Sequence, residues 1–211
     1  MPPDITPVQP RPYRGVPQDE RRAQRRSQLI GAAIAVYGER GYRQATVKAV
    51  CEAAGLTERY FYESFANSEE LLIASYNAVT SAVHGEMVAA AEAAGGNRDE
   101  RGRAMLQTYF AALQRDPRSA RVFLVEIRGV SRAVDKAFDA SLRSIGEQVG
   151  RIVGAEGADT DPLLLAGLVG GVMHIALRWI EDDYAPGIDA VTDAAMRLGD
   201  VLGLPVQRVK R

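Results

Sequence analysis

Three side chains within a short stretch are of the types that recognise nucleic acid: Arg59, Tyr60 and Tyr62. A guanidinium fork can donate to the O6 and N7 of one guanine, and such a bidentate pair discriminates against other bases by about 1–3 kcal/mol. Phe61 and Phe65 lie four residues apart, so on a helix both would anchor in one core. Arg59, Tyr60 and Tyr62 would then point away from that core, toward a partner.

Two short amphipathic helices within residues 46–72 must position these side chains, and residues 53–57 join them. Gly55 stands where the turn needs left-handed backbone geometry, which glycine adopts without steric cost. Thr57 follows as an expected N-cap, whose hydroxyl can satisfy free amides of the next helix. The pattern predicts a helix-turn-helix, and it makes double-stranded DNA the leading partner.

This ordered set of capping, turn and aromatic residues resembles the DNA-binding domain of TetR-family transcriptional repressors. The residues that carry the resemblance are Thr46-Val47, Ala54-Gly55-Leu56-Thr57, Phe61-Tyr62, Phe65 and Ser68-Glu69-Glu70-Leu71-Leu72. The resemblance implies a regulator that is not an enzyme. It also implies repression. In a repressor of this kind, a small effector changes the separation of the two DNA-binding domains of a dimer.

The second helix of the motif enters the major groove in the resembled family. The resemblance therefore implies that the base-reading residues are Thr57, Glu58, Arg59, Tyr60 and Tyr62. Phosphate contacts, which position a protein without specifying sequence, are expected from Thr46, Lys48, the Tyr62 hydroxyl and the helix N-terminus at Ser68.

The chain departs from the family pattern at three of these positions and at Ser64. Family members often carry lysine where Glu58 and Ser68 stand, a small residue where Arg59 stands, and an aromatic residue or histidine where Ser64 stands. The Glu58 carboxylate would then accept a hydrogen bond from a cytosine, pair with an arginine, or lower the nonspecific affinity for DNA. The missing lysine at position 68 removes one expected phosphate anchor.

Charge is unevenly distributed along the chain. The formal net charge of −1 argues against a protein that binds nucleic acid over its whole surface. Residues 11–60 nevertheless hold ten basic and five acidic residues, and Arg21, Arg22, Arg25 and Arg26 lie close together in the opening turns of the first expected helix. A solvated helix face is the alternative explanation for such a cluster.

The cysteine content and the apolar segments bear on location. Cys51 is the only cysteine, so no intrachain disulfide can form, and a cytoplasmic location is expected. Cys51 is read as a packing residue rather than a redox sensor. Residues 163–180 are apolar, but they contain His174 and Arg178, so a membrane span is not expected. Residues 1–18 lack the apolar run of a secretory signal.

The chain divides into three expected parts, all of them without β-strands. Residues 1–18 form a proline-rich arm, in which Arg11 and Arg14 either enter a minor groove or belong to an inert tail. Residues 19–66 form the DNA-binding domain, and residues 67–211 form a ligand-binding and dimerisation domain. Helical periodicity and Gly or Pro breaks predict nine helices: 19–40, the two of the motif, 68–94, 98–115, 118–129, 131–154, 162–182 and 188–203.

An effector pocket is expected among the helices after residue 67. Its candidate lining residues are Tyr76, Met105, Tyr109, Phe110, Phe123, Glu126, Phe138, Met173, His174 and Trp179, and His84 and Arg178 are further polar candidates. Aromatic residues and methionines at helical spacing are more often plain core. The candidates favour an apolar or amphipathic effector, such as a drug-like compound or a lipid.

A homodimer is expected because the last two helices are apolar over more than one face. The candidate interface residues are Leu164, Gly167, Leu168, Gly171, Ile175, Val191, Ala195, Leu198 and Leu202. The glycines would allow close backbone approach, and tight packing within one chain is the competing explanation. Two heads would read a near-palindromic operator.

Two other classes of protein remain open at this point. A helical-bundle enzyme could use His174, Glu126 and Arg178, but no phosphate loop, zinc-ligand spacing or nucleophile with its base is present. No cofactor or metal is therefore expected. A helical small-molecule-binding or interaction protein is the other alternative, and it would leave Arg59, Tyr60 and Tyr62 unexplained.

Overall fold

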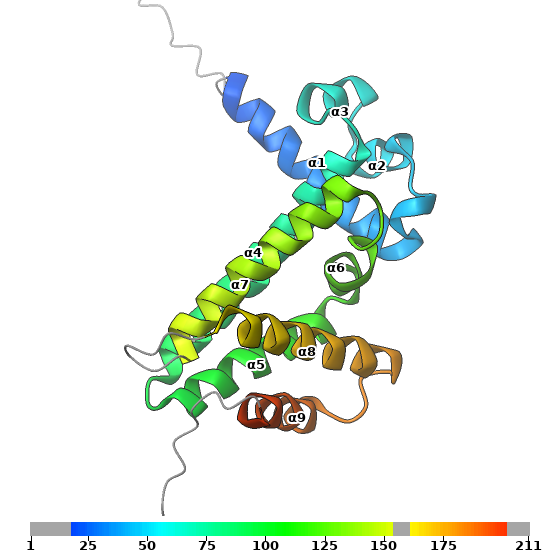
Figure 1. Ribbon diagram of the computed structural model, residues 1–211. Helices are drawn as coiled ribbons and strands as arrows, with labels where there is room; N and C mark the ends of the chain where they lie inside the picture. Colours follow the sequence, from blue (N-terminus) through cyan, green and yellow to red (C-terminus); the bar gives the residue numbers. More distant parts are fainter. Residues whose placement is uncertain (1–17, 154–160, 202–211) are drawn as a thin grey trace, which may run out of the picture.

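The computed structural model describes residues 18–153 and 161–201, and these residues form nine α-helices and no β-strand (Figure 1). The expected all-α fold is confirmed. The helices are α1 (Gln18–Arg40), α2 (Val47–Ala54), α3 (Glu58–Ser64), α4 (Ser68–Ala94), α5 (Arg98–Arg115), α6 (Pro117–Arg121), α7 (Arg132–Val153), α8 (Pro162–Glu181) and α9 (Ile188–Val201). We call residues 18–66 the head, and residues 67–153 and 161–201 the body.

Side-chain caps explain where several helices begin. Thr46 and Asn67 each accept a hydrogen bond from the backbone amide three residues further on, at 3.1 and 2.9 Å. Asn97 and Glu100 form a complete capping box before α5. Each such cap is worth roughly 0.5–2 kcal/mol. The capping residues therefore fix the starts of α2, α4 and α5.

The sequence predicts one helix over residues 118–129, and the structure corrects that prediction. α6 ends at Arg121, and Val122–Glu126 follows as a π-helical turn. The Glu126 carboxylate accepts hydrogen bonds from the Tyr42 amide and from Arg121, both at 2.7 Å. The Tyr42 contact comes from a distant part of the chain, so local sequence carries no signal for it.

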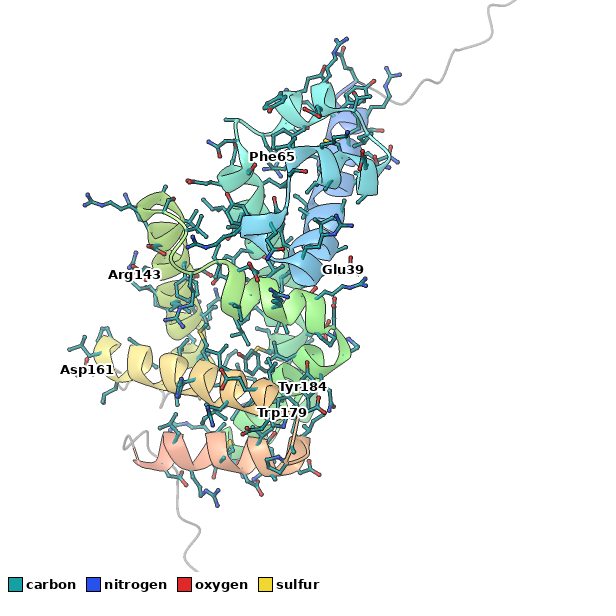
Figure 2. All side chains as sticks on the ribbon, turned by 90° about the vertical axis from the view of Figure 1, so that its right-hand side faces the viewer. Glu39, Phe65, Arg143, Asp161, Trp179 and Tyr184 are labelled. Atoms are coloured by element: carbon teal, nitrogen blue, oxygen red, sulfur yellow. The ribbon has the colours of Figure 1, made fainter. Side chains whose placement is uncertain are left out.

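Two phenylalanines, Phe61 on α3 and Phe65 just after it, hold the head together. The core between α1, α2 and α3 includes Leu29, Val50, Phe61 and Phe65, none of them more than 2% exposed. The two phenylalanine rings lie 5.9 Å apart between centroids, and Figure 2 places Phe65 within the head. The expected inward orientation of Phe61 and Phe65 is confirmed, and it fixes the opposite side of α3 as the outer side.

α4 belongs to both the head and the body. Leu71 and Leu72, in its first turn, are buried in a core that is continuous with that of the head. One turn later, Tyr76 stacks on Phe123 with 5.7 Å between ring centroids, and it also contacts Phe138 of α7. The long helices α4 and α7 run together through the body (Figure 1). A displacement of α4 in the body must therefore reach the head.

The head also docks on α6 and the turn that follows it. Gly38 of α1 lies so close to Arg118 that a Cβ there would be 2.6 Å from the Arg118 Cα. Glu39 pairs with Arg118 at 3.1 Å, and Figure 2 shows Glu39 at the body end of α1. Ser131, just before α7, donates to Glu69 of α4 at 2.8 Å. The joint between head and body is closely packed and polar.

Gly38→Ala is expected to lower the free energy of unfolding by about 1–3 kcal/mol, because backbone atoms of Arg118 cannot move aside as a flexible side chain would. Urea denaturation measures the change. Gly31→Ala is the matched control on the same helix, since a Cβ at Gly31 meets nothing within 4 Å. That control is expected to stabilise the protein by up to about 1 kcal/mol, from helix propensity. Equal effects of both changes would contradict a close α1–α6 contact.

α8 carries the apolar segment seen in the sequence. By length and composition alone it could cross a membrane, with a mean hydropathy of 1.8 over its apolar window. In the fold it packs against α7 and α9, and Leu165, Val169, Met173 and Ala176 form its buried side. The opposite side includes the exposed Leu163 and Leu164, with Leu163 at 81% exposure. α8 is thus a packing helix with one apolar side left open.

Candidate nucleic-acid interface and ligand-binding cavity

The turn between α2 and α3 has the geometry that the sequence predicts. Gly55 adopts left-handed backbone angles, φ 66 and ψ 29. Its amide donates to the Glu52 carbonyl at 3.1 Å, and the Leu56 amide donates to the Cys51 carbonyl at 2.9 Å. These two bonds form a Schellman motif, which ends α2 and fixes the direction in which the chain enters α3.

The structure corrects the expected capping role of Thr57. Its backbone is extended, as an N-cap requires, but its hydroxyl accepts no capping hydrogen bond from the described amides of α3. The Tyr60 amide donates instead to the Thr57 carbonyl, at 3.0 Å. The Thr57 side chain is exposed, so its hydroxyl can serve a DNA contact rather than the helix.

The predicted reading residues lie together on α3 and at its start. Thr57, Glu58, Arg59 and Tyr62 are exposed, with Arg59 at 84% and Tyr62 at 62%. Tyr60 is half-buried, because the guanidinium of Arg25 lies 4.5 Å from its ring centroid. Glu58 occupies the first position of α3, where a carboxylate stabilises the positive end of the helix dipole. Its position thus has a structural reason beside any contact with DNA.

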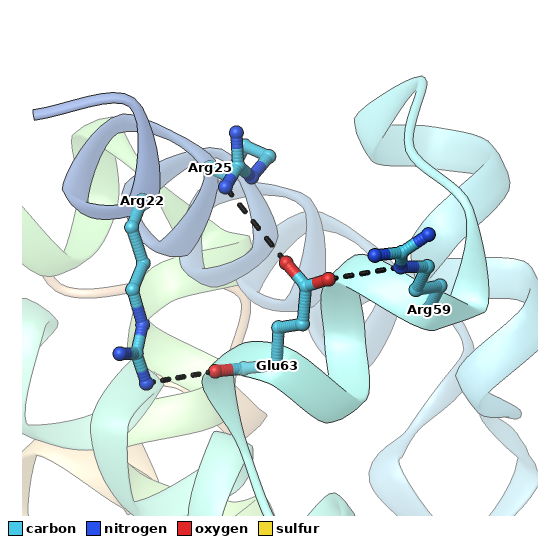
Figure 3. Close-up of polar contacts among 4 residues, drawn as sticks. All are labelled: Arg22, Arg25, Arg59 and Glu63. Atoms are coloured by element: carbon cyan, nitrogen blue, oxygen red, sulfur yellow. Dashed lines mark hydrogen bonds and ion pairs between the residues drawn. The ribbon is translucent and has the colours of Figure 1, made fainter. Parts of the chain in front are cut away.

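Glu63 joins three arginines of this surface (Figure 3). Its Oε1 accepts from the Nε of Arg59 at 3.0 Å, and its Oε2 lies 3.8 Å from a terminal nitrogen of Arg25. Its backbone carbonyl accepts from Arg22 at 2.9 Å. Because Arg59 is held through Nε, its two terminal nitrogens remain as an edge that fits guanine O6 and N7. We name these four residues, Arg22, Arg25, Arg59 and Glu63, the Glu63 cluster.

Glu63→Gln is expected to strengthen binding to random-sequence DNA and to steepen its dependence on salt. The change removes one negative charge among three arginines, and nonspecific affinity follows the number of phosphates neutralised. Fluorescence anisotropy with a random duplex at several salt concentrations measures both quantities. Glu86→Gln is the control, since Glu86 pairs with Arg115 on the exposed surface of the body, at 2.8 Å. Weaker nonspecific binding by Glu63→Gln would contradict the expected charge effect.

The predicted phosphate contacts lie beside the reading residues. Thr46 is exposed, and its oxygen accepts from the amide of Ala49, which leaves the hydroxyl hydrogen to donate. Lys48 is exposed, and Ser68 is half-buried at the first position of α4. Arg11 and Arg14 lie outside the described residues. Cys51 is buried, and burial raises the pKa of its thiol, as expected of a packing residue.

A cavity of about 150 Å³ lies in the body between α4, α5, α7, α8 and α9. Its wall is mostly apolar. The residues that form it include Val83, Met87, Met105, Leu106, Tyr109, Phe123, Ile145, Val149, Val172, Met173 and Met196. Polar groups enter the wall at Thr80 and His84 of α4 and at Arg98 and Asp99 of α5. The cavity can hold an apolar molecule with few polar groups.

The structure brings four of the ten predicted pocket residues to this wall: Met105, Tyr109, Phe123 and Met173. The other six have different neighbours. Tyr76 and Phe138 pack against each other, Phe110 packs on Trp179, and the Trp179 indole donates to the Pro186 carbonyl. Glu126 lies in the joint between head and body, and His174 is exposed on α8. Arg178, a further polar candidate, pairs with Glu181 on the same exposed face.

The predicted dimer residues fall into two groups. Leu168, Val191 and Ala195 are buried within the chain, and Gly171 contacts the Leu198 side chain closely. Packing within one chain therefore accounts for these five. Leu164 and Gly167 are exposed on α8, Ile175 is half-buried, and Leu202 lies outside the described residues.

Sequence reasoning missed two features that the structure places in these sites. The first is Glu63, although its spacing of four residues from Arg59 is that of a helical ion pair. The second is most of the α4 face that lines the cavity, at Thr80, Val83 and Met87; only His84 of this face was among the polar candidates. Spacings of three, four and seven residues mark one side of a helix, and this was the available signal.

Comparisons with known proteins agree with this geometry. The family model described as bacterial regulatory proteins, tetR family, matches residues 29–75. The HTH-type transcriptional activator FasR of Mycolicibacterium smegmatis is 25% identical over 199 residues, which are 92% of this chain and 88% of FasR. The fatty acid degradation regulator FadR of Bacillus halodurans has a similar fold, with a TM-score of 0.72 and 21% identity, over 87% of this chain and 97% of FadR. FadR of Bacillus subtilis, in complex with stearoyl-CoA, matches with a TM-score of 0.66 and 21% identity, over 82% of this chain and 96% of that one.

The residues matched by the family model run from within α1 into α4, so they contain the turn, α3, and Arg59 and Glu63 of the Glu63 cluster. The similarity to FasR extends over nearly the whole chain, and the FadR structures share the arrangement of helices in the body as well. Residues 29–75 therefore form a DNA-binding domain of the tetR family of bacterial regulatory proteins, and the protein is a DNA-binding transcriptional regulator rather than an enzyme.

Proposed function

We propose that this chain is a ligand-responsive repressor that binds a near-palindromic operator as a homodimer and is released by an apolar or amphipathic effector. Such a protein acts in the cytoplasm, where the DNA is. Residues 18–66 read the operator, through Thr57, Arg59, Tyr60 and Tyr62 at the bases and through Thr46, Lys48 and the start of α4 at phosphates. Residues from 67 onward bind the effector and the second chain.

The observation that carries this proposal is that one helix serves both sites. Leu71 and Leu72 of α4 pack in the core shared with the head, and Thr80, Val83 and His84 of the same helix line the cavity. A ligand shifts an equilibrium only if it prefers one of the two states. A molecule that moves α4 on entering the cavity also moves the head, so it can prefer one separation of the two heads.

A second connection runs through the π-helical turn. Phe123 of this turn lines the cavity, and Glu126, three residues later, accepts the Tyr42 amide at 2.7 Å in the head. π-Helical turns are uncommon and often accompany function. A ligand that displaces Phe123 would therefore act on the head through Glu126 as well as through α4.

The open side of α8 is the proposed dimer contact. Leu163 and Leu164 are 81% and 39% exposed, and a Cβ at Gly167 or Gly170 would meet none of the described residues within 4 Å. A large exposed apolar surface is unfavourable in water, and a two-fold partner can bury it. Leu164 and Gly167 of the predicted set lie in this contact.

The class of effector is supported by the cavity and by one structural relative. The wall is mostly apolar, and FadR of Bacillus subtilis was solved in complex with stearoyl-CoA, which has an apolar chain and a polar head. An apolar or amphipathic effector fits both observations.

Activation is the second candidate function, because FasR, similar over 92% of this chain, is a transcriptional activator. The same DNA-binding head can belong to a repressor or to an activator. Transcription from a promoter that carries the operator, measured with purified components, separates the two. Fewer transcripts on adding the protein indicate repression, and more transcripts indicate activation.

The test of the proposed function combines sedimentation with operator release. Sedimentation velocity with a duplex that carries an inverted repeat is expected to show two chains, or a multiple of two, per duplex. Effector-class compounds, with stearoyl-CoA as the first probe, are then titrated against the labelled complex by anisotropy. Release of the duplex by a compound that also binds the free protein supports the proposal. One chain per duplex, or no release by any apolar compound, would overturn it.

A further inference from the structure

The wall of the cavity holds three buried polar atoms with no hydrogen-bond partner among the described residues: Thr80 Oγ1, His84 Nε2 and Tyr109 Oη. Tyr109 is only 5% exposed, so its hydroxyl is removed from bulk water. A buried polar group without a partner is costly, and native structures contain few of them. These atoms therefore form the polar part of an otherwise apolar site.

The three atoms belong to one cluster on facing helices. Thr80 and His84 lie one turn apart on α4, and Tyr109 comes from α5, which packs along α4. Tyr76 adds a further hydroxyl: burial raises its pKa and the neighbouring Ser141 and Thr80 side chains partly offset this, yet it makes no hydrogen bond of normal geometry. The phenols of Tyr76 and Tyr109 influence each other as well. A single small polar group on a ligand can reach this cluster.

The cluster is electrically neutral at physiological pH. Burial raises the pKa of the Tyr109 and Tyr76 hydroxyls, so both stay protonated. Burial, together with the positive charge of Arg151, lowers the pKa of His84 and keeps its imidazole neutral. The charged residues of the wall, Arg98 and Asp99, stand at the start of α5, about 16 Å along the helix from Tyr109. The cluster itself thus offers neutral donors and acceptors, and the nearby Arg151 is exposed and is not among the described residues that line the cavity.

The size of the cavity limits the ligand further. Its volume of about 150 Å³ is that of a cavity that takes up benzene, and it is below the roughly 300–1,000 Å³ of sites for drug-sized molecules. An unbranched acyl chain of eighteen carbons has no polar group along its length for the cluster.

We infer that the ligand of this cavity is a compact, uncharged apolar molecule of one or two rings, whose single hydroxyl or carbonyl group hydrogen-bonds with Thr80, His84 and Tyr109. This inference rests on the proposed function, in which the cavity is the effector site, and it narrows the effector to a chemical class. The rings contact the aliphatic wall, and the polar group selects the ligand against hydrocarbons of the same shape.

The test is calorimetric titration of the full chain, without DNA, with 2-naphthol and with the shape-matched 2-methylnaphthalene. The hydroxyl is expected to improve binding by about tenfold or more, because it satisfies groups that are otherwise unpaired. Tyr109→Phe and Thr80→Val remove one hydroxyl each while keeping the shape of the side chain. Each is expected to reduce the ratio of the 2-naphthol affinity to the 2-methylnaphthalene affinity. Tyr37→Phe is the matched control, a buried tyrosine in the head, and it should leave the ratio unchanged.

The possible results separate this inference from the proposed function. The inference is supported if the preference for 2-naphthol falls in Tyr109→Phe and Thr80→Val while the free energy of unfolding in urea is unchanged or higher. Equal binding of the two naphthalenes, or a preference that survives both substitutions, overturns it. If 2-naphthol fails to bind while stearoyl-CoA binds and releases the operator, the inference falls and the proposed regulation stands. If the naphthol preference holds but no compound changes operator affinity, the cavity chemistry stands and the proposed regulation fails.

Discussion

Replacing Phe61 with alanine is expected to lower the free energy of unfolding by about 3–5 kcal/mol and to abolish DNA binding. Phe61 is fully buried between α1, α2 and α3, and its ring contacts those of Phe65 and Tyr62. A truncated side chain leaves a cavity that a small three-helix core cannot fill by collapse. Because Phe61 fixes the rotation of α3, even the folded fraction would present Arg59 in the wrong direction.

Urea denaturation and operator binding, measured on the same preparation, check this expectation. Tyr62→Ala is the matched control on the adjacent position, since Tyr62 is 62% exposed. It should change stability by roughly 0.5 kcal/mol or less, as surface substitutions do, while still weakening DNA binding. A stable Phe61→Ala variant that binds the operator normally would contradict the packing described for the head.

Arg59→Ala is expected to remove discrimination at one guanine in each half-site, a loss of about 1–3 kcal/mol per half-site, or about 5- to 150-fold. Stability should barely change, because Arg59 is 84% exposed and its pair with Glu63 is an exposed helix pair. The loss should fall on operators that carry the guanine and leave substituted operators almost unaffected. Binding to a set of single-base operator variants measures this pattern.

Lys48→Ala is the control for Arg59→Ala, because a phosphate contact carries no sequence information. It should weaken binding to all the variants alike and reduce the salt dependence by about one phosphate. If Arg59→Ala also weakened all operators equally, Arg59 would be a phosphate contact, and the base readout would belong to Tyr62 or Thr57.

The helices could be predicted closely from the sequence, because their ends are marked by local chemistry. Asn67, Asn97 and Asp161 cap the helices that follow them, and Gly55 and Gly95 end the helices before them. Each of these signals acts within a few residues of the helix end. The π-helical turn at Val122–Glu126 could not be predicted, since one of its stabilising partners, Tyr42, is more than eighty residues away.

The reading surface could be predicted better than the cavity, for a physical reason. A helix-turn-helix is set by its own turn and core, so the exposed side of α3 follows from Gly55, Phe61 and Phe65. A cavity is what remains after large side chains have packed. Aromatic residues bury the most surface, so Phe110 and Trp179 pack on each other, and the open space is left among aliphatic residues such as Val83 and Val149.

The orientation of the polar side chains depends on three-dimensional contacts that the sequence does not display. Thr57 has the right type and position for a cap, yet its hydroxyl is not used as one. Glu126 has the right type for a pocket carboxylate, yet it accepts a hydrogen bond from the Tyr42 amide at the joint between head and body. In both cases the residue type is compatible with several partners, and packing between distant helices decides which partner is nearest.

The central claim is that residues 18–66 read a specific DNA sequence with α3. Selection of bound duplexes from a random DNA pool by the purified protein, repeated with the Arg59→Ala variant and followed at several salt concentrations, tests it most directly. We expect the wild-type protein to enrich an inverted repeat that contains a guanine in each half, and the variant to lose the preference for that guanine. Weak, salt-sensitive binding without any enriched sequence, or the same sequence from both proteins, would contradict the claim.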